Sequence, residues 1–221
     1  ICRGDAHAPM PDVSGLWRES GFCFMPQVGA IFSTSLVPML IGLFAGSAAI
    51  AAFGVLQRFY GLALQLHNMV LLPSWPAYAQ AAADRDGAFA RRMFRTSWLV
   101  TAGAFMLPTL LLTPWMPALV RLWLGAQAPV IAPGLLWAVA LWHLLHFSGQ
   151  TVATALNGLG RIRAMAALVW AGIAISLGLC SLLGPRWGAI GVVIALGLPH
   201  ALIGLPLTVC HANRSLRNIS R

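Results

Sequence analysis

A row of polar and small residues lies in the strongly apolar stretch 48–78 and contains Arg58, which helix packing alone does not explain. Arg58 is the only Asp, Glu, Lys or Arg between residues 48 and 78. At 100° per residue, Gln65 and Asn68 fall on the same side of a helix as Arg58. The row also contains small residues, namely Ser47, Ala51, Gly54 and Gly61. Small residues favour close helix packing, but a guanidinium in that position is typical of a binding or transport site.

A second polar row lies further along the chain and contains titratable side chains. His143, His146, Gln150, Thr154 and Asn157 recur at helical spacing. Two polar rows in one helical bundle predict a hydrated cavity between them. The candidate binding residues are therefore Arg58, Gln65, Asn68, His143, His146 and Gln150.

The same residues do not predict a metal site or a catalytic centre. Zinc requires three or four ligands, and no Cys or carboxylate accompanies His143 and His146 at a suitable spacing. His67 projects opposite Arg58, which predicts an ordinary packing or interfacial role. The acidic residues all lie in predicted loops, namely Asp5, Asp12, Glu19, Asp84 and Asp86. The cysteines form no CxxC pair, and they are Cys2, Cys23, Cys180 and Cys210. We therefore expect no enzyme activity and no cofactor.

The elements that carry these rows are long apolar helices. Of 221 residues, 59% are hydrophobic and 9% are charged, whereas a soluble domain has about 25% charged residues. Uncharged stretches exceed the roughly 20 residues needed to cross a bilayer. The expected helices are 21–45, 48–78, 96–120, 130–156, 163–183 and 188–210. None has a charged face, which argues against a large soluble helical protein. The predicted fold class is an all-α polytopic membrane protein with six transmembrane helices.

The arginines predict the orientation of this bundle. With the six helices above, eleven of the 14 arginines fall on one side. The opposite side has Arg121 and Arg186, so the positive-inside rule places both ends of the chain in the cytoplasm. The net charge of +9 then reflects the orientation in the membrane, because anionic lipid headgroups hold the basic loops on the cytoplasmic side. We expect no nucleic-acid partner.

These assignments divide the chain into three parts. Residues 1–20 form a cytoplasmic lead-in, residues 21–211 form the six-helix transmembrane lobe, and residues 212–221 form a basic cytoplasmic tail. The polar start at Ile1 predicts that the chain is part of a longer protein. In the last helix, the stretch around Pro199, His200 and Gly204 predicts a kink.

Several short motifs resemble one transporter family. The segment from Ala51 to Arg58, AAFGVLQR, resembles the eighth helix of Wzx-type flippases for lipid-linked oligosaccharides. The run from Leu156 to Arg163, LNGLGRIR, is similar to the basic turn after the tenth helix of the polysaccharide-biosynthesis branch of the MOP superfamily. The run from Gly184 to Gly191, GPRWGAIG, is similar to the turn before the twelfth helix.

The resemblance implies a fold and a function. This chain would be the second lobe of a two-lobed MOP/MATE-like transporter, and its partner would be the amino-terminal lobe of the same protein. The implied activity is flipping of an undecaprenyl-diphosphate-linked oligosaccharide across the bacterial inner membrane by alternating access. Arg58 would then bind the diphosphate through its planar bidentate fork, assisted by His143 and His146.

Two other interpretations remain open. A cation-coupled drug exporter of the same superfamily is expected to have a membrane carboxylate, and this chain has none in its predicted helices. A non-transporting scaffold would keep the helices without the transport site. A polymerase or ligase for lipid-linked sugars is disfavoured, because the longest internal loop is about 17 residues and such an active site needs large extramembrane loops.

Overall fold

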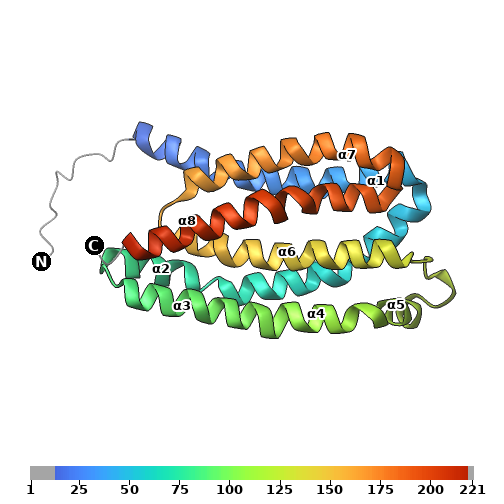
Figure 1. The fold of residues 1–221 in the computed structure, drawn as a ribbon, viewed down its shortest axis with the longest axis horizontal. Coiled ribbons are helices and arrows are strands. Elements are labelled where there is room, and N and C mark those ends of the chain that lie inside the picture. The colour runs from blue at the N-terminus through green and yellow to red at the C-terminus, as the bar shows by residue number, and fades with distance from the viewer. Residues whose placement is uncertain (1–12, 219–221) are drawn as a thin grey trace, which may run out of the picture.

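The described part of the chain consists of helices joined by short turns and loops, and it contains no strand. The computed structural model describes the backbone of residues 13–218 and the side chains of residues 35–161 and 167–215. The α-helices are α1 (Val13–Leu71), α2 (Ser74–Ala83), α3 (Gly87–Val100), α4 (Leu107–Leu112), α5 (Met116–Leu124), α6 (Pro133–Gly158), α7 (Ile162–Pro199) and α8 (Leu205–Asn218). They form an elongated bundle of side-by-side helices (Figure 1). The predicted all-α class is therefore confirmed.

Two glycines reverse the direction of the chain inside α1 and α7. Gly46 has a φ of 79° and Gly188 a φ of 55°, a region in which a side chain is strained and glycine is favoured. Across the first reversal, a β-carbon on Gly42 would meet the Ile50 side chain at 2.7 Å. Each of these two elements thus consists of two helices lying side by side.

The two reversals lie at the same end of the bundle. A β-carbon on Gly188 would meet that of Ala45 at 3.4 Å, and one on Gly134 would meet Ile190 at 2.7 Å. We call this the Gly46 end. At the opposite end, a β-carbon on Gly158 would meet the Tyr78 side chain and the Trp75 carbonyl, and we call it the Gly158 end.

Three helical stretches of the described residues are long and apolar enough to cross a membrane. They are Ser35–Ala83, Gly87–Gln127 and Ala167–Ser215. Large apolar side chains remain exposed along them, with Met39, Leu43 and Met69 each at least 70% exposed. Apolar surface of this kind is stable in lipid and unfavourable in water. These features are typical of an α-helical membrane protein.

Helix α6 is not among these three stretches, and it lies at the centre of the bundle. It contacts α1, α2, α3, α7 and α8. Leu136, Val139 and Val152 are at most 5% exposed and belong to the apolar core. Protein covers most of this helix, so polar side chains on it can bond to neighbouring helices and need not face lipid. The histidine row of the sequence therefore lies on the helix that the bundle buries most.

The helical path widens into a π-helix at two places, each just before a proline. The π segments are Thr101–Met106 and His200–Gly204, and they precede Pro108 and Pro206. A proline ring clashes with the carbonyl four residues earlier and has no N–H to donate to it. A wider turn accommodates the ring without ending the helix. The second segment is the site of the predicted kink.

Candidate functional site

Arg58 lies on the outer surface of the described bundle. Its side chain is exposed, as are those of Ser47, Ala51 and Gln65 on the same row. Arg58 forms no hydrogen bond or ion pair with the described residues. A β-carbon added at Gly54 or Gly61 would meet no atom within 4 Å, so the row is uncovered along most of its length.

The contacts of the next turn give the depth of Arg58. The ring of Tyr60 packs on the ring of His143, with centroids 5.1 Å apart. His143 is ten residues into α6, about 15 Å along a helix that begins at the Gly46 end. Arg58 is two residues closer to that end, which puts its Cα about 12 Å below it. The guanidinium is therefore within the apolar length of the bundle and nearer the Gly46 end than its middle.

The α6 row faces inward and meets a third histidine. His146 stacks on His200 of the second π-helix, with ring centroids 5.9 Å apart and planes at 15°. His143 and His146 each donate from Nδ1 to the carbonyl four residues earlier, because a carbonyl only accepts. His200 donates from Nε2 to the carbonyl of Leu145, at 3.1 Å. The three rings thus tie α6 to the segment after α7.

This contact depends on a glycine. A β-carbon on Gly149 would meet His200 Nε2 at 2.6 Å and Cε1 at 2.8 Å. Only a residue without a side chain lets the imidazole lie against α6 at this point. From the sequence, His200 was expected only to lie near a kink. Its contact with His146 follows from the position of Gly149 in the folded chain.

The two polar rows meet at one hydrogen bond. Gln150 Nε2 donates to Asn68 Oδ1 at 3.2 Å, which joins α6 to α1. No hydrogen bond or ion pair joins Arg58 to His143 or His146 within the described residues. The structure therefore brings together Asn68 and Gln150, leaves Arg58 and Gln65 on an open face, and buries His143.

A separate polar network is sealed inside the bundle. His67 is fully buried, and its Nε2 lies 2.9 Å from Thr101 Oγ1, which lies 2.8 Å from Thr151 Oγ1. Thr151 in turn donates to the Phe147 carbonyl. With that donation in place, Thr101 donates to Thr151 and His67 donates to Thr101. The predicted packing role of His67 is thereby confirmed, since the network joins α1, the first π-helix and α6.

We expect Thr101→Val to destabilise the protein, because the buried His67 donor and the Thr151 acceptor lose their shared partner. Leaving such a group unsatisfied costs about 1–3 kcal/mol. Thermal unfolding of the purified protein measures the effect. Thr96→Val, at an exposed position on α3, is the control and should change stability by less than about 0.5 kcal/mol. Equal unfolding temperatures for the two variants would show that the network does not stabilise the fold.

The fold and these rows are those of an all-helical protein with three stretches long and apolar enough to cross a membrane, and with an exposed polar face beside a buried polar network. Comparison with protein families, with curated proteins and with solved structures finds no match for this chain.

Proposed function

We propose that this chain is the six-helix lobe of a flippase that moves an undecaprenyl-diphosphate-linked oligosaccharide across the bacterial inner membrane. The two helices of α1, the two of α7, the α3–α4 rod and α6 would make the six crossings. We call the exposed row of Ser47, Ala51, Arg58 and Gln65 the Arg58 face. A second lobe of the same protein would cover this face and close a cavity against it. The arginines favour cytoplasmic termini, because Arg85, Arg91, Arg92, Arg95 and Arg161 lie at the Gly158 end.

The observation that carries this proposal is the open, uncompensated guanidinium of Arg58. A cation at the centre of the bilayer costs about 2.5–3.5 kcal/mol on an insertion scale when no partner offsets it, and part of this cost applies to Arg58 because it lies within the apolar length of the bundle. Gly54 and Gly61 leave free space on both sides of it. An exposed cation without a described partner, flanked by free volume, is suited to an anionic ligand that enters from outside this chain.

The chemistry of the face fits a lipid diphosphate linked to a sugar. Arg58 presents two parallel N–H donors to phosphate oxygens. Gln65 is exposed two helical turns further along, and its amide can both donate to and accept from sugar hydroxyls. Transport would proceed by alternating access of the two lobes without any covalent step, and we propose no enzyme activity, metal or cofactor.

Two other functions are distinguished by their substrates. A drug exporter needs an anionic group for a cationic drug, and no carboxylate lies within the described membrane stretches, since Asp84 and Asp86 occupy the turn after α2. A scaffold would move no substrate. The Arg58 face favours an anionic ligand over a cationic one.

A reconstituted assay tests the proposal directly. The native protein containing this chain is placed in vesicles with an undecaprenyl-diphosphate-linked labelled oligosaccharide in the inner leaflet. We expect the label to become accessible to a glycosidase that cannot cross the membrane, faster than in protein-free vesicles. Efflux of ethidium without lipid flipping would identify a drug exporter, and movement of neither would identify a scaffold.

A further inference from the structure

Helix α5 leaves the direction of the bundle. Tyr60 bonds to Thr113 with an O–O distance of 2.9 Å. The adjacent Phe59 packs against Trp123, with ring centroids 5.5 Å apart. Thr113 and Trp123 are ten residues apart, which would separate them by about 15 Å along a continuous helix. Because both reach the same turn of α1, α5 folds across the end of the α3–α4 rod.

The residues that turn the chain are visible in the sequence of this segment. Pro114 lies in a short 3₁₀ turn and Pro117 at the start of α5. Gly125, with a φ of 57°, ends the helix. Without this turn the stretch Gly87–Gln127 would measure about 60 Å, twice the thickness of a hydrocarbon core. With it, the rod from Gly87 to Leu112 measures about 39 Å.

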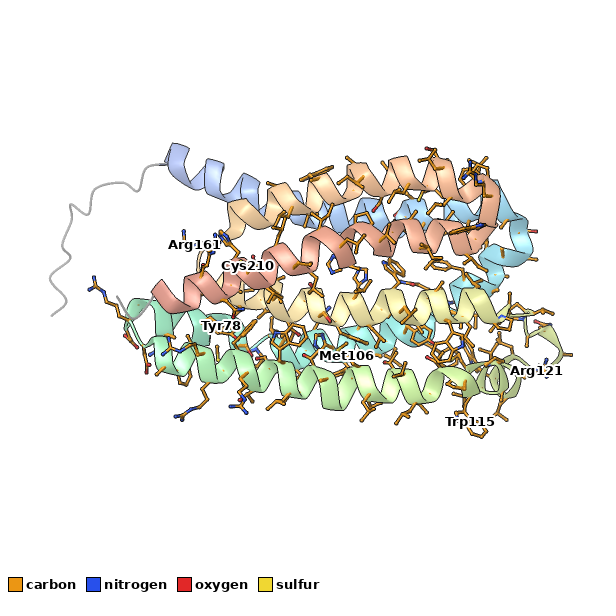
Figure 2. All side chains as sticks on the ribbon, viewed as in Figure 1. Tyr78, Met106, Trp115, Arg121, Arg161 and Cys210 are labelled. Atoms are coloured by element: carbon orange, nitrogen blue, oxygen red, sulfur yellow. The ribbon has the colours of Figure 1, made fainter. Side chains whose placement is uncertain are left out.

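Helix α5 has two apolar faces, and the described residues cover only one of them. Met116 and Val120 are buried against the core. On the other side, Leu122 is 85% exposed and Trp115 is 67% exposed. Arg121 lies next to this exposed face, and Figure 2 shows Trp115 and Arg121 pointing away from the helices at the Gly46 end.

We propose that α5 lies in the membrane interface at the Gly46 end and inserts its exposed face among the phospholipids. Tryptophan is enriched at this level because its ring is apolar and its N–H is polar. Arg121 completes the face, because its guanidinium can reach a lipid phosphate while its stem stays in the apolar layer.

A second part of the chain supports the same membrane level. Trp187 is 56% exposed and follows the exposed Arg186, just before the reversal at Gly188. This pair is at the Gly46 end, as is α5. Two segments distant in sequence thus present tryptophan and arginine at the same end of the bundle. This pattern is typical of the part of a membrane protein that lies at the level of the lipid headgroups.

The test is the depth of a spin label at position 122. The four cysteines are replaced by alanine, and Leu122→Cys is labelled in phosphatidylethanolamine and phosphatidylglycerol vesicles. Leu99→Cys, on the exposed side of α3 near the middle of the rod, gives a deep reference. Arg85→Cys, in the exposed turn at the Gly158 end, gives an aqueous reference. Collision rates with oxygen and with a water-soluble nickel chelate are measured at each position.

We expect the oxygen-to-nickel collision ratio at residue 122 to fall between the two references, which places the label just below the phosphates. A ratio equal to that of the Arg85→Cys label would put α5 in water and overturn the proposal. A ratio equal to that of the Leu99→Cys label would make α5 part of a span. Low collision rates with both reagents would mean that protein, such as a second lobe, covers this face.

Discussion

Replacement of Arg58 by alanine is expected to lower the rate of lipid-linked glycan flipping about 10- to 100-fold. Hydrogen bonds to a charged group are worth about 1.5–3 kcal/mol, and each 1.4 kcal/mol corresponds to a factor of ten. The loss should appear mainly as weaker binding of the diphosphate. Arg58→Lys should recover part of the rate, because an ammonium keeps the charge and loses the planar pair of donors. The vesicle assay with labelled lipid-linked oligosaccharide measures both variants.

A matched control separates a lost binding group from a lost fold. Arg92→Ala removes an exposed arginine from α3 at the opposite end of the bundle, and we expect it to flip lipid at the native rate. Arg58 is exposed and forms no hydrogen bond or ion pair with the described residues, so both variants should insert and unfold like the native protein. Native flipping by Arg58→Ala would reject Arg58 as the binding group and leave the proposed flippase function standing.

Gly191→Ala is expected to destabilise the protein more than Thr101→Val or Arg58→Ala. A β-carbon at this position would overlap the backbone carbonyl of Leu183 across the reversal in α7 and lie 3.1 Å from Trp187 Cβ. Backbone atoms cannot rotate away as a side chain can. Overpacking typically costs about 1–3 kcal/mol, and a clash with backbone belongs at the upper limit. For a chain of this size, about 3 kcal/mol lowers the melting temperature by about 6–12 °C.

The control for this change lies on the same helix. Gly178 is exposed, and a β-carbon there would meet nothing within 4 Å. Gly178→Ala should leave stability unchanged or raise it by up to about 1 kcal/mol, because alanine favours helix more than glycine does. Thermal unfolding in detergent compares the two variants. Similar melting temperatures would show that the α7 hairpin opens at Gly188 under the conditions of the measurement.

Much of the fold follows from local rules. The apolar composition and the scarcity of charge predicted an all-helical membrane protein, and the structure has the all-helical class with three stretches long and apolar enough to cross a membrane. The gap expected between residues 45 and 48 contains Gly46, where the dihedral angles leave the helical region. Breaks of this kind are readable from sequence because glycine and proline act through their own backbone geometry.

The sequence did not predict which side chains of the two polar rows are buried or which neighbouring helices they contact. Helical spacing puts His143 and Arg58 on comparable polar faces, yet one is buried and the other exposed. Periodicity fixes the angle between residues of one helix, but not which neighbouring helix meets that face. For the same reason, the contact of His146 with His200 depends on packing between α6 and the segment after α7.

The sequence by itself determined the helical class and the apolar character of the helices, and it identified Arg58 as a candidate ligand for an anion. These properties reside in composition and in spacing along one helix. Only the tertiary structure decided that α6 is the central helix, that α5 turns across the end of the bundle, and that the Arg58 face is left uncovered. Those outcomes depend on which helix surfaces pack together, and this packing is set by the three-dimensional path of the whole chain.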